Sequence, residues 1–188
     1  SALIVAVLAT GLGATLFVLV VIDAPVLRPM PFPDAERLVQ IGESDHNEPG
    51  FLDAMNSQDL LDLRAALTRF DAVESFSGGT MNLSDGKHVE RYDGQFVSGG
   101  LFSLIDVDAQ IGRTLNADDD RPGAPARVVI SDRVWRQRFA ASPDVLGQIV
   151  RINMEPAEII GVMPVGFAFP FVSDVWTAAR DATGQPET

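Results

Sequence analysis

Hydrophobic and polar positions divide the chain into an apolar N-terminal stretch and a longer part in which the two kinds alternate. Residues 1–22, SALIVAVLATGLGATLFVLVVI, contain no charged side chain. As a helix rising about 1.5 Å per residue, this stretch would be about 33 Å long, which matches the hydrocarbon core of a bilayer. The pattern predicts a transmembrane helix over residues 1–24. The alternatives are a signal peptide, which would want a basic n-region, and a buried core helix, which would show a polar face.

Four prolines follow the apolar stretch, at Pro25, Pro29, Pro31 and Pro33. Proline lacks an amide donor and disfavours helical conformation in the residue before it. We therefore expect residues 25–36 to form a stiff, extended connector and not a flexible linker. A stiff joint would transmit movement between an anchor and the domain that follows.

From residue 37 onward, short segments predict strands and two segments with helical spacing predict helices. The strand candidates are residues 37–42, 72–78, 87–98, 110–115, 127–131, 147–153 and 157–163, the last two forming a hairpin around Met154 to Pro156. The helix candidates are residues 56–70, with Leu60, Leu63, Leu67 and Phe70 on one face, and residues 131–139, capped by Ser131, with Trp135 and Phe139 one turn apart. The predicted fold class is α+β, with the N-terminal transmembrane helix followed by a compact mixed α/β domain over residues 37–188.

Composition narrows the possible partners. The 14 Lys and Arg residues stand against 26 Asp and Glu residues, which gives a formal net charge of −12. Such a surface repels phosphate backbones, so we expect no nucleic-acid partner. The chain contains no cysteine, which excludes disulfides, thiolate metal sites and cysteine nucleophiles but does not identify a compartment.

Few residues suggest chemistry. His46 and His88 have polar neighbours and lack metal-site spacing, and no phosphate-binding loop is present, so we do not expect the chain to bind ATP. Asp118, Asp119 and Asp120 offer oxygen ligands for a hard cation, but they lack the alternating acids and closing glutamate of a calcium loop. A solvated acidic turn is the favoured interpretation. We predict no catalytic, cofactor-binding or metal-binding residue.

An aromatic segment lies near the C-terminal end. Residues 161–170, GVMPVGFAFP, and the residue after them present Phe167, Phe169 and Phe171. These side chains predict either an interaction surface or, as is more usual, rings that fold under a loop.

The order of these segments resembles the MacB-type periplasmic core domain of FtsX/MacB-like ABC transporter permeases. The similarity begins with LRPMPFPD after the apolar stretch and continues through ARVVISDRVWRQRF, DVLGQIVRIN, IIGVMPVGFAFP and DVWTAA. Within FVSGGLFSLIDVDAQIGRTLNADDD, the matching residues are Val97, Ser98, Phe102, Gly112 and Arg113. The chain departs from the family pattern at residues 108–109, where proline is common, and at residues 154–155, where the hairpin turn usually contains glycine.

The resemblance implies a non-catalytic role. A cytoplasmic ABC ATPase subunit or domain would hydrolyse ATP, and the remaining permease membrane helices would carry its movement outward. The chain would sit in the lipid of the inner (cytoplasmic) membrane, with residues from about 25 onward in the periplasm or extracytoplasmic space. The resemblance also implies a permease dimer, a possible periplasmic partner protein, and that this is an N-terminal fragment whose residues 37–188 form the first part of the core domain.

Two other classes of function stay open at this point. One is a secreted or membrane-tethered extracytoplasmic binding module unrelated to transport, which the signal-peptide interpretation would favour. The other is a metal-dependent extracytoplasmic enzyme that uses Asp118 to Asp120.

Overall fold

The computed structural model describes residues 11, 13, 35–42, 57–86, 88–121 and 123–179, without the side chains of residues 57–61. The chain divides into two units, Ser1–Val39 and Gln40–Thr188. In the first unit, Gly11 and Gly13 are helical, and a short 3-10 helix, η2 (Ala35–Arg37), is formed.

The predicted transmembrane helix over residues 1–24 and most of the predicted connector over residues 25–36 lie outside the described residues. Within the described ranges, the structure contains no helix of sufficient length and hydrophobicity to cross a membrane.

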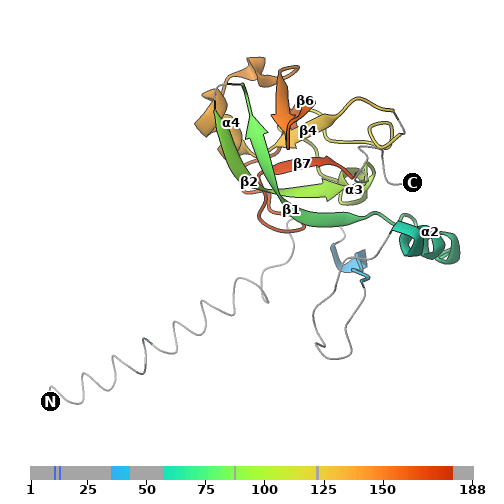
Figure 1. The fold of residues 1–188 in the computed structure, drawn as a ribbon. Coiled ribbons are helices and arrows are strands. Elements are labelled where there is room, and N and C mark those ends of the chain that lie inside the picture. The colour runs from blue at the N-terminus through green and yellow to red at the C-terminus, as the bar shows by residue number, and fades with distance from the viewer. Residues whose placement is uncertain are drawn as a thin grey trace, which may run out of the picture. The chain divides into compact units, whose positions relative to one another are not determined.

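The second unit contains one mixed sheet with short helices (Figure 1). Its elements in chain order are α2 (Ser57–Ala66), β1 (Phe76–Ser84), β2 (Val89–Val97), α3 (Leu101–Leu104), β3 (Ile111–Gly112), β4 (Arg127–Ile130), α4 (Asp132–Phe139), η3 (Pro143–Val145), β5 (Ile149–Ile152), β6 (Glu155–Val162) and β7 (Val175–Ala178).

The strands close into a ring. Their order is β3-β6-β4-β7-β2-β1-β5, and β5 also pairs with β6, so that only β3 lies outside the closed ring. The β2–β7 and β4–β6 pairs are parallel, and the remaining pairs are antiparallel. The predicted compact mixed α/β domain is therefore confirmed for the described part of the second unit.

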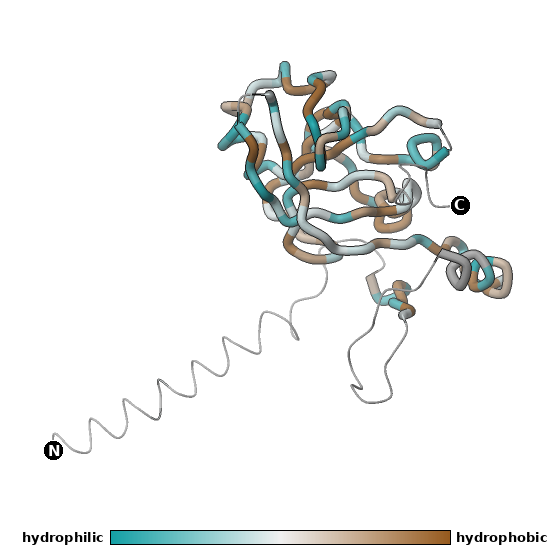
Figure 2. The backbone as a smooth tube through the Cα atoms, viewed as in Figure 1, coloured by the Kyte–Doolittle hydropathy of each residue, from teal (hydrophilic) through white to brown (hydrophobic). Residues whose placement is uncertain are grey.

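Hydrophobic residues lie along several of the strands, whereas α4 and the turns are mainly hydrophilic (Figure 2). One buried cluster takes alternate residues from the strands, including Met81, Leu83, Val128 and Ile130, and receives Trp135 from α4. Alternation places the other residues of these strands on the opposite face of the sheet. On β7 all four residues are buried, so this strand is covered on both faces.

Two glycines allow β3 and β6 to approach closely. A Cβ atom on Gly161 would lie 2.1 Å from the carbonyl oxygen of Arg113, and one on Gly112 would lie 2.2 Å from that of Ile160. Gly112 also has a φ of 76°, which side chains disfavour. Its match to the family pattern therefore has a structural reason.

The structure corrects two predicted elements. Residues 37–42 form no strand, because they join no described ladder, and Val39 and Ile41 are exposed. The helix predicted over residues 56–70 ends at Ala66, so Phe70 lies beyond it and is exposed. Leu63 is only half-buried, and the other described side chains of α2, those of residues 62 and 64–66, are exposed.

The other elements are confirmed with shifted bounds. The strand predicted over residues 72–78 is β1 and continues to Ser84, whereas the one predicted over residues 110–115 is limited to the two residues of β3. The hairpin turns at Asn153 and Met154, whose φ values of 50° and 76° suit a tight two-residue turn, and Pro156 already belongs to β6. Ser131 caps α4 as predicted, since its Oγ accepts a hydrogen bond from the Val134 amide at 3.1 Å.

Candidate functional site

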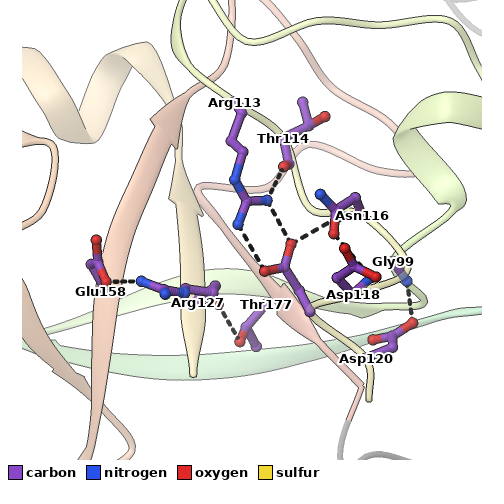
Figure 3. A network of polar contacts seen from close by, with 10 residues as sticks. Gly99, Arg113, Thr114, Asn116, Asp118, Asp120, Arg127, Glu158 and Thr177 are labelled. Atoms are coloured by element: carbon purple, nitrogen blue, oxygen red, sulfur yellow. Dashed lines mark hydrogen bonds and ion pairs between the residues drawn. The ribbon is translucent and has the colours of Figure 1, made fainter. Parts of the chain in front are cut away.

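The three consecutive aspartates differ in their contacts, and Figure 3 shows those of Asp118 with Asn116 and of Asp120 with Gly99. Asp118 is exposed and pairs with Arg121 at 2.9 Å. Asp119 is only 5% exposed and accepts two hydrogen bonds from the Arg113 guanidinium, at 2.6 and 2.9 Å, and one from the Asn116 amide at 2.9 Å. The solvated acidic turn that the sequence favoured is therefore correct for Asp118 and wrong for Asp119.

Asp120 is half-buried and incompletely paired. Its Oδ2 atom accepts a short hydrogen bond from the Gly99 amide, whereas its Oδ1 atom is buried and has no partner among the described residues. Burial raises the pKa of Asp120 above its ordinary value, and the negative charge of Glu74 adds to this effect, while the Gly99 hydrogen bond opposes it. Burial also disfavours ionisation of Asp119, but the Arg113 and Asn116 hydrogen bonds outweigh it and lower the pKa of that group.

The segment that follows β2 contacts both the turn that contains the three aspartates and the residues just before β1. The Ser98 hydroxyl donates to the Glu74 carboxylate and accepts a hydrogen bond from the Ser75 amide at 2.8 Å. A Cβ atom on Gly99 would lie 2.1 Å from the Asn116 carbonyl oxygen, and one on Gly100 would lie 2.2 Å from Glu74 Oε1. The VSGG segment, residues 97–100, therefore contacts both residues 74–75 and the backbone of Asn116.

A second polar network connects α4 to the start of β7. Asp174 accepts hydrogen bonds from the Ser131 hydroxyl at 2.9 Å and from the Arg133 guanidinium, whose Nε lies at 2.9 Å. Asp132 accepts from Arg136 at 2.7 Å and from Gln110 at 2.9 Å. These hydrogen bonds thus join segments that lie far apart in the sequence and that match the family pattern.

The structure does not bring the candidate metal ligands together. In the part of the chain that it describes, no group of three or more His, Asp or Glu side chains could hold a metal ion. The His88 side chain is exposed, and its backbone amide donates to Asp85 at 2.9 Å. His46 lies outside the described residues.

The aromatic segment satisfies both interpretations, each at different residues. Phe167 is half-buried, with its ring centroid 6.1 Å from that of Phe102 and 5.4 Å from that of Trp176. Phe169 and Phe171 instead lie beside Phe76, at 6.2 and 6.3 Å. Phe171 is 59% exposed, so the outer end of the segment presents an apolar surface.

One cluster has no signal in the sequence. The Arg138 side chain is only 7% exposed, donates to the His88 carbonyl oxygen at 2.6 Å, and lies 3.5 Å from Asp85 and 3.8 Å from Glu90. These groups lie about 50 residues apart along the chain, and no local pattern predicts their contact. They attach the β1–β2 turn to α4.

The amino-acid sequence matches the model of a known family. The model of the MacB-like periplasmic core domain matches residues 1–187, and the chain belongs to this family. The resemblance inferred from the sequence is therefore confirmed.

The chain is similar to solved extracytoplasmic domains of transporters, one of them with a TM-score above 0.5. The extracellular domain of the noncanonic ABC-type transporter YknZ from Gram-positive bacteria has a TM-score of 0.52 and 21% identity, over 64% of this chain and 60% of that one. The periplasmic region of MacB from Actinobacillus actinomycetemcomitans has a TM-score of 0.44 and 16% identity, over 65% of each chain. The chain thus spans less than two thirds of the length of either domain. No curated protein matches it.

Proposed function

We propose that this chain is the non-catalytic extracytoplasmic part of an ABC transporter permease. In this role it couples ATP hydrolysis by a partner to conformational change outside the membrane, for export or for force transmission. The observation that carries the proposal is the family match along residues 1–187.

The proposed anatomy follows the sequence. Residues 1–24 anchor the chain in the inner (cytoplasmic) membrane as the first membrane helix of the permease, and residues 25–36 form a stiff connector. Residues 37–188 form the periplasmic core domain on the far side. The partners are a cytoplasmic ABC ATPase, the remaining membrane helices of the permease, and a second copy of the permease.

The polar contacts support a mechanical role for the core domain. Asp119, Asp132 and Asp174 are buried carboxylates, and each is paired with an arginine of another turn or of the same helix. Charge-assisted hydrogen bonds of this kind are directional and fix the loops that they join. Together with the closed ring of strands, they favour a domain that moves as one body when its connector is displaced.

Spin labelling tests the coupling. These 188 residues contain no cysteine, so Met154→Cys, at an 82% exposed position on the β5–β6 turn, adds one defined site for a nitroxide once any cysteine elsewhere in the permease is replaced. In permease dimers reconstituted with their ABC ATPase, we expect Mg-ATP to change the label-to-label distance distribution. A hydrolysis-deficient ATPase should stop this change from cycling. An unchanged distribution with active ATPase would contradict the proposal.

A further inference from the structure

The outer edge of β1 is open over its first residues. β1 pairs with β2 along its whole length, from Phe76 to Ser84. On its other side it pairs with β5 only at Leu83 and Ser84. Across the ranges that the structure describes, no strand pairs with the outer edge from Phe76 to Met81 (Figure 1).

The hydrogen bonds of Asn82 show in which direction the backbone groups on this edge point. The Asn82 amide donates to Asn153 Oδ1, and the Asn82 carbonyl oxygen accepts from the Asn153 amide, both at 2.9 Å. Asn82 therefore directs its backbone groups away from β2. Because this direction alternates along an antiparallel strand, Phe76, Gly78 and Thr80 also direct theirs outward. No backbone hydrogen bond from a described residue reaches these three.

The open edge lacks the usual protection against pairing. Natural edge strands carry lysine, proline or a bulge, or are very short. Residues 76–81, FSGGTM, contain no charge and no proline, and their pairing with β2 continues without a register shift.

An apolar surface lies beside the same edge. Met81 and Leu83 point into the buried cluster, so alternation places Phe76 on the outer face of β1. Its ring lies beside that of Phe171, and the next residue, Val172, is 81% exposed. A strand added here would place a side chain against exposed apolar groups.

We propose that the edge of β1 from Phe76 to Met81 accepts an extended segment of a partner protein as an additional strand. Main-chain hydrogen bonds would provide affinity, and the Phe76 and Phe171 rings would select an apolar or aromatic side chain at one position. The partner segment is cationic, because a chain with a net charge of −12 attracts positive segments and repels a second copy of itself. This inference rests on the geometry of β1 and does not depend on the proposed coupling to ATP hydrolysis.

Amide exchange measured by NMR tests the proposal residue by residue. The probe is a synthetic peptide, Lys-Thr-Phe-Thr-Val-Thr-Val-Thr-Lys, added to the full 188-residue chain. We expect the amides of Phe76, Gly78 and Thr80 to exchange rapidly without peptide and at least about 10-fold more slowly with it. The amides of Ser77 and Gly79 face β2 and should not respond, so they are internal controls.

Two variants of Gly78 distinguish the effect of losing its amide donor from the effect of adding side-chain volume. Gly78→Pro removes an outward amide without removing a β1–β2 hydrogen bond, which an edge strand tolerates. It should weaken peptide binding about 10-fold, because the peptide loses one main-chain hydrogen bond and can no longer approach the strand closely at this position. Gly78→Ala keeps the amide, and its Cβ atom would meet Gln95 Nε2 at an ordinary 3.4 Å, so its affinity should stay that of the wild type.

Each other outcome contradicts a stated part of the proposal. Protection of Gly78 and Thr80 without peptide would mean that the edge is already occupied. Protection that grows with protein concentration alone would identify a second copy as the occupant. Equal binding of a peptide with glutamate in place of both lysines would refute the charge selection. No slowing at millimolar peptide would refute strand addition, even if Gly78→Pro failed to fold.

Discussion

At the scale of single residues, Asp120 is held as a carboxylate in a place that suits a neutral group. Its Oδ1 atom is buried without a described partner, and burial followed by the charge of Glu74 raises its pKa. Folding therefore favours the protonated form. The stability gained from that proton is fully present below the unfolded-state pKa of about 3.9 and is lost as the pH rises through the raised folded-state value.

Asp120→Asn should consequently stabilise the domain at neutral pH by about 1 kcal/mol, since it removes a buried charge and keeps an acceptor for the Gly99 amide. It should also remove this component of the pH dependence. Chemical denaturation at several pH values measures both effects. Asp118→Asn, at an exposed position, is the matched control and should change stability little. A destabilised Asp120→Asn variant would show that the carboxylate has an attractive partner.

Asp119 has the opposite dependence on pH. Burial disfavours its charge, but the hydrogen bonds from Arg113 and Asn116 lower its pKa overall. Its contribution to stability is present above the unfolded-state pKa of about 3.9 and is lost as the pH falls through the lowered folded-state value. Arg113→Ala should reduce the free energy of unfolding by about 2 kcal/mol at neutral pH, because it leaves the carboxylate buried with one remaining donor.

The same variant should also lose less stability on acidification than the wild type. Denaturant melts between neutral and acidic pH compare the two proteins. In Arg113→Ala/Asp119→Asn, where the unpaired charge is gone, part of the loss should be recovered. If both variants melt like the wild type at every pH, the ion pair does not stabilise the acidic turn.

At the scale of elements, α4 packs against the ring of strands with Trp135 and Val134, which both belong to the buried cluster. The Trp135 side chain is 9% exposed and donates from its indole nitrogen to the Ser142 carbonyl oxygen at 2.8 Å. Trp135→Ala should cost about 3–5 kcal/mol, from lost transfer free energy and a residual cavity. Phe139 is only half-buried, so Phe139→Ala should cost less. Equilibrium denaturation orders the two, and an unchanged Trp135→Ala variant would mean that the indole is a contact residue for a partner.

The elements also show which predictions a sequence supports. β4 and α4 were predictable because their signals are local: a short apolar run, the Ser131 cap and helical spacing. Residues 37–42 alternate like a strand, but a strand also needs a partner, and alternation carries no information about one. Closure of the ring was not predictable, since it requires β5 to meet residues of β1 about 70 positions earlier.

In the candidate site too, local features were predictable from the sequence and long-range contacts were not. The sequence identified Asp118 to Asp120 as a group but could not separate their roles. Those roles depend on Arg113 and on Gly99, which lies 21 residues before Asp120. The Phe167 and Phe171 rings look alike in sequence, yet one packs on Trp176 and the other is exposed, because the loop turns between them.

At the scale of the whole molecule, the central question is which side of the membrane the second unit occupies. Family membership and the fold favour the extracytoplasmic side, and the proposed coupling requires it. A soluble domain on the cytoplasmic side would meet the ATPase directly and would need neither an anchor nor a stiff connector to receive its movement.

Cysteine accessibility measures this directly, because every introduced thiol is unique in the chain. Met154→Cys and Val89→Cys place thiols at exposed positions, and Val129→Cys places one in the fully buried interior as a control for unfolded protein. In intact spheroplasts, a membrane-impermeant maleimide should label Met154→Cys and Val89→Cys at once and Val129→Cys only after denaturation. Labelling of Met154→Cys and Val89→Cys that appears only after the membrane is permeabilised would place the domain in the cytoplasm and contradict the account.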